Sequence, residues 1–139
     1  MQDTAPEVVS IADACLGGLY GRSALLIGPE EQRSPYATLL RRAGMIYIFQ
    51  EDTPLYVSSL LSQVQLLISV PAPTVFEPVP LLTAASIAQG CAGRHTPLLI
   101  FDLAQSTSVE EIAGLLPAVC LYTPEDLRRV LSQVMASSY

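Results

Sequence analysis

A short apolar run that breaks at a glycine carries the clearest chemical signal in this chain. The run Ser23–Ile27 ends at Gly28, and the helix-favouring sequence Pro29–Arg33 follows it. A strand, a tight glycine turn and a helix N-terminus together form a phosphate cradle, because free backbone N–H groups and the helix dipole point at one spot. The motif that usually builds this cradle is G-x-G-x-x-G. Only its first glycine is present, since Glu30 and Arg33 occupy the second and third glycine positions. We therefore predict a dinucleotide-binding scaffold whose binding motif is degraded.

Acidic residues follow two other apolar runs and are further candidates for ligand contacts. Glu51 and Asp52 lie at about the distance after Gly28 at which an acid accepts a hydrogen bond from a ribose hydroxyl. We favour a helix cap as their role. Asp102 ends another run, where it either contacts a ligand or caps a loop. The predicted cofactor-binding set comprises residues at the ends of these runs, namely Gly28, Pro29, Glu30, Glu51, Asp52, Val70 and Asp102.

Glu30 has a second interpretation, which it shares with Glu31. Both acids stand where the phosphates of a dinucleotide would lie, and acids in the first turn of a helix also stabilise its dipole. We favour the second role, in which the chain's own carboxylates occupy the anion site.

The residues that commonly perform catalysis or bind metals are few and scattered. The single histidine, His95, lies in a turn, so no Ser/His/Asp or Cys/His arrangement can be built around it. The three cysteines lack metal-ligand spacing. Cys15 and Cys120 occupy apolar positions and are expected to pack as small hydrophobic side chains, whereas Cys91 is the candidate for an exposed thiol. We predict no catalytic residue and no metal site.

Composition narrows the class of protein. The chain has 139 residues, of which 50% are hydrophobic and 14% charged, and its formal net charge is −6. We expect one globular domain over residues 1–139, with residues 1–21 as a leading helix and link. The basic residues are all arginine, so a P-loop lysine and a Schiff-base lysine are excluded. The acidic balance argues against direct nucleic-acid binding, and the short apolar runs argue against a membrane span. We expect a cytoplasmic protein with reduced thiols.

Strand-like and helix-like segments alternate along the chain. We predict strands at residues 24–27, 45–49, 65–70, 97–101 and 118–122. Helices are expected at 6–19, 55–61, 83–89, 108–115 and 124–135, and a further helix that starts near Glu30 or near Ser34–Pro35 is expected to end at Ala43. The strand segments are continuous apolar runs, as in parallel strands buried on both faces. The predicted fold is therefore α/β: a doubly wound, parallel, five-stranded, Rossmann-like sheet with helices on both faces. We expect strand order 3-2-1-4-5, with the switch point between strands one and four.

Three helix starts carry recognisable capping signals. Thr123 is a candidate N-cap, with Pro124 at the first helical position. Asp52 or Thr53 is expected to cap the helix at 55–61. The pair formed by Ser108 and the glutamate three residues later has capping-box spacing.

The order of these segments resembles the central nucleotide-binding domain of the glutamyl-tRNA reductase family over nearly the whole chain. The leading helix is similar to the family's Ser-x-x-Ala helix, and a Gly-x-Leu-x-Gly link follows it. The first strand then enters a turn that keeps the family's glutamate at Glu31. The segments carrying the resemblance are Ser10–Ala14, Gly18–Arg22, Gly28–Arg33, Pro97–Ala104 and Val119–Leu127.

Two of the family's specific motifs are altered here. Gln50–Thr53 replaces the Asn-Arg-Thr that receives the adenosine phosphate of NADPH, so acids stand where the resemblance implies an arginine. Gln105–Thr107 replaces the Pro-Arg-Asp segment. The resemblance also implies a catalytic domain with a nucleophilic cysteine and a dimerisation helix, neither of which has a counterpart in these residues. We therefore expect no tRNA-dependent reduction by this chain alone.

Three functional hypotheses follow. The first is a glutamyl-tRNA-reductase-like domain without stand-alone catalysis that acts as a binding or scaffold partner in tetrapyrrole (haem) biosynthesis. The alternative is a working NAD(P)-binding module of a reductase-type oxidoreductase that acts with a separate catalytic domain. The third is a small binding protein that uses the switch-point crevice for another ligand. We expect no cofactor under the first hypothesis and NADP or NAD if the site is active. The possible partners are a protein of tetrapyrrole synthesis and a second copy of the chain. We expect the chain to bind neither nucleic acid nor a membrane.

Overall fold

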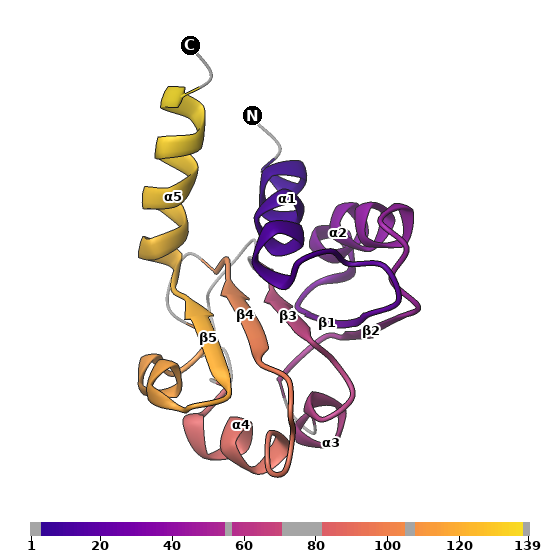
Figure 1. Ribbon diagram of the computed structural model, residues 1–139, viewed down its shortest axis with the longest axis vertical. Coiled ribbons are helices and arrows are strands. Elements are labelled where there is room, and N and C mark those ends of the chain that lie inside the picture. The colour runs from indigo at the N-terminus through magenta and orange to yellow at the C-terminus, as the bar shows by residue number, and fades with distance from the viewer. Residues whose placement is uncertain (1–3, 55–56, 71–81, 105–107, 138–139) are drawn as a thin grey trace.

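The computed structural model describes residues 4–54, 57–70, 82–104 and 108–137 (Figure 1). Helices and strands alternate along it. The elements are α1 (Ala5–Leu16), β1 (Ser23–Ile27), α2 (Glu30–Arg42), β2 (Tyr47–Glu51), α3 (Ser58–Leu61), β3 (Leu66–Ser69), α4 (Ala84–Gly90), β4 (Leu98–Asp102), the 3₁₀ helix η1 (Glu111–Leu115), β5 (Val119–Tyr122) and α5 (Pro124–Ser137). The predicted α/β class is confirmed.

The strands form one parallel five-stranded sheet, but their order differs from the predicted one. The order is β2-β1-β3-β4-β5, so β3 pairs with β1 and not with the outer side of β2. The switch point therefore lies between β1 and β3, and the prediction that placed it between strands one and four is wrong. In an open sheet of this kind, ligands bind at the carboxyl ends of the strands that flank the switch point.

Burial explains this order. All residues of β1, β3 and β4 are buried, as expected of strands covered on both faces. In contrast, β2 and β5 contain no buried residue and form the two edges. The sequence of β2, Tyr-Ile-Phe-Gln-Glu, ends in polar residues that suit an edge, whereas the Leu-Leu-Ile-Ser of β3 needs a central position.

Two hydrophobic cores cover the two faces of the sheet. One core joins α1, α2 and the start of α5 to the sheet through residues such as Val8, Leu40 and Leu127. The other joins α3, α4 and η1 through residues such as Leu61 and Ile87. The helices therefore lie on both faces, as a doubly wound sheet with right-handed crossovers requires.

Of the predicted helix caps, one is confirmed and the others are wrong. Thr123 caps α5 as predicted, because its Oγ1 accepts from the Asp126 N–H at 3.1 Å. The helix predicted at 55–61 is shorter, since α3 begins at Ser58, and residues 55–56 lie outside the described residues. Thr53 therefore does not cap this helix, whose N-cap residue is Val57. Ser108 does not cap a helix either, because a short 3₁₀ turn starts three residues later.

Candidate functional site

Two predicted site residues at the switch point, Gly28 and Val70, approach each other closely. Gly28 follows β1 with a φ of 131°, a conformation that side chains other than glycine rarely adopt. A Cβ atom on it would lie 2.5 Å from Val70 Cγ2 and 3.1 Å from the Val70 carbonyl oxygen. The Gly28 N–H also donates to the Glu51 carbonyl at 2.9 Å. The glycine thus permits close packing of two strand ends, and its N–H is already engaged.

The N-terminus of α2 carries fewer free backbone donors than a phosphate cradle. Pro29 is its N-cap residue and has no N–H to offer. The Pro29 carbonyl accepts from the N–H groups of Gln32 and Arg33, both at 3.0 Å. Glu30 and Glu31 are exposed in the first turn, where their charges favour the helix dipole. The interpretation of these acids as dipole-stabilising groups is consistent with this position.

Arg33, at the third glycine position, reaches the end of β2. Its Nη2 lies 3.1 Å from Asp52 Oδ1, and the two side chains are 9% and 82% exposed. The Nε of Arg33 is buried without a hydrogen-bond partner. Because this donor has no partner, Asp52 compensates the buried guanidinium only in part. An unsatisfied buried donor lowers the stability of the folded state. Asp52 pairs with Arg33 and does not cap α3, which corrects the favoured interpretation of that residue.

Sequence reasoning missed this pairing. It treated Arg33 only as a failed glycine and inferred that the segment after β2 holds acids without a cation. An arginine three residues into α2 lies one helical turn from the strand ends, and a long side chain spans that distance. The combination of an arginine in the glycine motif with an acid after β2 was the available signal.

Asp102 is the most buried charged residue described, with 1% exposure. Its Oδ1 accepts from Ala104 N–H at 3.2 Å and from Ser108 Oγ at 2.8 Å. Its Oδ2 accepts from the N–H groups of Ser108 and Val109 at 2.8 and 3.0 Å. Four donors therefore occupy this carboxylate, which fixes the segment before η1 to the end of β4. These contacts correspond to the alternative in which Asp102 caps a loop.

Two serines extend the Asp102 network and were not predicted. Ser69, the last residue of β3, lies 2.7 Å from Ser108 through the two hydroxyl oxygens. Because the Ser108 hydroxyl donates to Asp102, its oxygen is left to accept from Ser69. Ser69 is buried, and no histidine or lysine adjoins this chain of groups. The network therefore ties β3, β4 and the following loop together and lacks a base that would activate a nucleophile.

The burial of the three cysteines is the opposite of the prediction. Cys91 is the C-cap residue of α4. It is buried because it belongs to the core that α4 shares with α3 and η1. Cys15 and Cys120 are exposed. Cys120 lies on the edge strand β5, and burial raises its pKa, as does the neighbouring Cys15. His95 is exposed in its turn, as predicted.

The predicted site residues thus come together at the carboxyl edge, but as internal contacts. Gly28 meets Val70 and Glu51, and Asp52 meets Arg33. Asp102 lies two strands away from β1 and serves its own loop. Among the described residues, no cluster of three or more histidine, cysteine or acidic side chains could hold a metal ion. None of the described helices combines the length and apolarity needed to traverse a bilayer.

The chain was compared with known proteins by sequence and by fold. No family model matches the chain. The chain is 27% identical to a glutamyl-tRNA reductase from Methanospirillum hungatei over 143 residues, covering 88% of the chain and 34% of the relative. It is 26% identical to a glutamyl-tRNA reductase from Alkalilimnicola ehrlichii over 140 residues, covering 90% of the chain and 31% of the relative.

A solved structure gives the same result for the fold. Glutamyl-tRNA reductase from Methanopyrus kandleri superposes with a TM-score of 0.76 at 19% identity, covering 94% of this chain and 37% of that one. The chain therefore spans about a third of the length of the relatives it matches. The resemblance indicated by the sequence is confirmed: the chain is similar over most of its length to about a third of these glutamyl-tRNA reductases, and its fold is Rossmann-like.

Proposed function

We propose that this domain does not hold a dinucleotide and acts as a binding or scaffold partner in tetrapyrrole (haem) biosynthesis. The observation that carries the proposal is the Arg33–Asp52 pair. Asp52, one of the two acids expected to accept from a ribose hydroxyl, is paired with the arginine that replaces the third glycine. The Gly28–Val70 contact and the proline at the helix start support the same interpretation, because both remove room or donors from the diphosphate position.

The relatives support the tetrapyrrole part of the proposal. Both curated relatives are glutamyl-tRNA reductases, and the chain matches one contiguous third of each. A domain that keeps the fold but fills its cofactor crevice can still present its outer surface to a partner.

Calorimetry tests the cofactor-free part of the proposal. We expect no heat of binding when NADPH or NADH is titrated into the chain, with a full-length glutamyl-tRNA reductase as the positive control. Micromolar affinity for either nucleotide would overturn this part. The scaffold part is tested by sedimentation of the chain mixed with a glutamyl-tRNA reductase. A joint complex is expected, and two independent species at all concentrations would contradict it.

A second candidate function is a working NAD(P)-binding module that acts with a separate catalytic domain. One observation favours it: the buried Nε of Arg33 has no partner, and the carboxylate that pairs with this side chain is 82% exposed. The exposed carboxylate can return to water when it leaves this pair, but the buried guanidinium then needs another anion. A phosphate group could then replace it beside the guanidinium.

The substitution Asp52→Asn separates the two functions. It removes the competing negative charge at an exposed side chain and should preserve the fold. Under the second function, Asp52→Asn strengthens binding of NADPH, whose extra phosphate needs the guanidinium, and leaves NADH binding unchanged. Under the first, neither nucleotide binds the variant. Glu31→Gln, which removes a nearby exposed acid that lacks this ion pair, is the matched control.

A further inference from the structure

We propose that the outer edge of β2 pairs with the same edge of a second copy of this chain, antiparallel across a two-fold axis. This inference does not depend on whether the domain binds a dinucleotide. It begins with the sheet order, in which β2 pairs only with β1 among the described strands. The outer backbone groups of β2 therefore face away from the sheet.

The edge lacks the devices that usually prevent such pairing. Protected edge strands carry lysine, proline or inward-pointing charges, or a bulge that twists them away. The central residues of β2, Ile48, Phe49 and Gln50, are uncharged, and the only acid of the strand is Glu51 at its end. The chain contains no lysine anywhere. An uncharged edge strand of five residues is long enough to add to another sheet.

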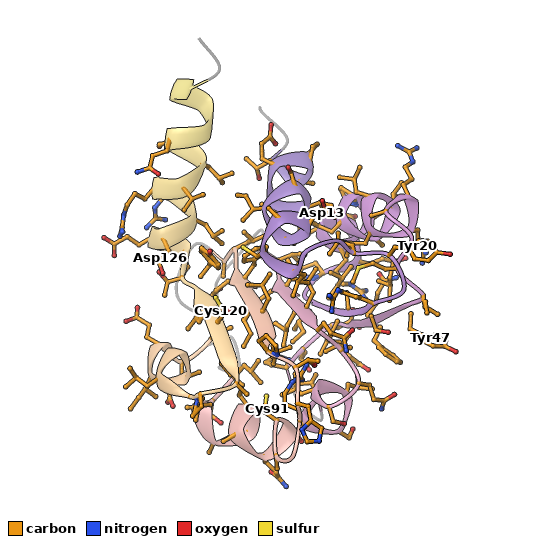
Figure 2. The ribbon with its side chains drawn as sticks, viewed as in Figure 1. Asp13, Tyr20, Tyr47, Cys91, Cys120 and Asp126 are labelled. Carbon is orange, nitrogen blue, oxygen red and sulfur yellow. The ribbon has the colours of Figure 1, made fainter. Side chains whose placement is uncertain are left out.

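Large exposed side chains gather around this edge. Tyr47 is 63% exposed and stacks on Phe49, with ring centroids 6.3 Å apart. Ile46, just before the strand, is 62% exposed. Tyr20 is 88% exposed and lies against Gly44, where an added Cβ would meet its ring at 2.5 Å. Figure 2 shows Tyr20 and Tyr47 on the same side of the molecule, away from Cys120 and Asp126. Contiguous exposed apolar groups of this kind mark contact surfaces.

The distribution of charge along α2 identifies the occupant as a second copy. This helix contacts β1 and β2, with Glu30 and Glu31 in its first turn and Arg41 and Arg42 in its last. Antiparallel pairing of β2 with its copy keeps equivalent faces of the two sheets together. Strands are about 4.8 Å apart, so the two α2 helices then lie about 10–14 Å from each other, running in opposite directions. The acidic end of each helix faces the basic end of the other.

The same axis gives the aromatic side chains a partner. Tyr47 and Phe49 alternate with Ile48, which belongs to the core under α1 and α2, so they project from the opposite face. Two-fold pairing brings the Tyr47–Phe49 pair of one copy next to that of the other. Each surface element thus meets its own counterpart or a complementary charge, as an isologous interface requires.

Sedimentation of the full chain at physiological salt tests the proposal. We expect a monomer–dimer equilibrium that shifts toward the dimer as protein concentration rises. Tyr47→Lys places a lysine on the edge at an exposed position and should raise the dimer dissociation constant by about tenfold or more. Leu115→Lys changes a side chain that is 81% exposed in η1, near the other edge of the sheet, and should leave the dimer intact. Circular dichroism verifies that both variants are folded. A monomer at every concentration, or a dimer weakened only by Leu115→Lys, overturns the proposal.

A charge-exchange experiment tests the occupant and the orientation together. One variant carries Arg41→Glu and Arg42→Glu, and the other carries Glu30→Arg and Glu31→Arg. Each variant alone should dissociate more readily than the parent, because like charges then face each other across the axis. Their mixture should form a heterodimer, since the acidic ends of one copy face the basic ends of the other. Failure of the mixture to associate while the parent dimerises rejects the antiparallel arrangement of α2.

Discussion

Gly28 shows how one residue can keep a motif's shape without its function. The first glycine of a dinucleotide motif makes the tight turn after the strand, and Gly28 makes that turn. Its surroundings differ from a cradle, because Val70 fills the space beside it. The sequence predicted the turn from the glycine. It could not predict the contact, since that depends on β3 pairing with β1.

Replacing this glycine should be costly for stability. Gly28→Ala combines a strained positive φ with a Cβ too close to Val70, and we expect a loss of about 2–4 kcal/mol in the free energy of unfolding. Urea denaturation measures it. In the background of Val70→Ala the close side-chain contact is gone, so the same substitution should cost less. Equal costs in both backgrounds would show that backbone strain alone constrains this position.

Tyr122 illustrates a residue whose environment sequence patterns do not reveal. Its hydroxyl lies 3.6 Å from Cys15 Sγ, although the two residues are 107 positions apart. This hydrogen bond, followed by burial and nearby charges, raises the pKa of Tyr122 to about 12. A cysteine at an apolar position of a helix is expected to pack in the core. Cys15 of α1 is instead exposed, and its thiol contacts Tyr122 of β5. Long-range neighbours decide such cases.

The raised pKa has a testable consequence above neutral pH. Between about pH 10 and 12 the folded state retains a proton that the unfolded state has lost, so stability falls as pH rises through this range. Cys15→Ala should lower the pKa of Tyr122 toward its ordinary value and reduce that fall. NMR of ring-labelled tyrosines, assigned with Tyr122→Phe, follows the titration. Cys91→Ala, which alters a cysteine beside α4 on the other face, is the control, and identical titration in parent and Cys15→Ala would refute the coupling.

At the scale of elements, the alternation of strands and helices was predictable and the strand order was not. Apolar runs gave the five strands to within a few residues because their periodicity is local. The order depends on which strands need burial on both faces. The strand β2 ends in polar residues, whereas β3 is apolar up to its last residue. This difference indicates that β2 belongs at the edge. The predicted order 3-2-1-4-5 put β3 outside β2 by analogy with dinucleotide folds.

The packing of α3 on α4 depends on a second close approach. Gly90 is the last residue of α4, one residue beyond the end of the helix predicted at 83–89. A Cβ on it would lie 2.6 Å from the Ser58 carbonyl oxygen and 2.7 Å from Leu61 Cβ. The missing side chain lets these two short helices touch, which in turn covers the face of the sheet opposite α1.

Gly90→Ala should therefore destabilise the domain by about 1–3 kcal/mol, as overpacking does, despite alanine's better helix propensity. Thermal unfolding followed by circular dichroism measures the change. Gly114→Ala is the matched control, because a Cβ there would make only ordinary contacts, the closest at 3.6 Å from Leu121 Cβ. It should alter stability by about 0.5 kcal/mol or less. Similar losses for both variants would contradict the role of the α3–α4 contact.

At the scale of the whole molecule, β2 and β5 form the two edges of the sheet. The β5 edge is followed directly by α5, whose first turn is fixed by the reciprocal Thr123–Asp126 hydrogen bonds. The β2 edge continues into the segment that holds Asp52. Among the described strands, each edge strand pairs on one side only. The exposed side chains of Ile46 and Tyr47, and not the absence of a covering helix, are therefore the reason to expect association at the β2 edge.

Association should also appear in the thermal stability of the parent chain. A dimer that forms only from folded copies stabilises them by mass action, so Tm should rise with protein concentration. The substitution Tyr47→Lys should remove most of this dependence while changing Tm at high dilution only slightly, because the side chain is already exposed in the single copy. Scanning calorimetry over a wide concentration range measures both quantities. A Tm that is independent of concentration in the parent, with full reversibility, would mean that folding and association are not linked.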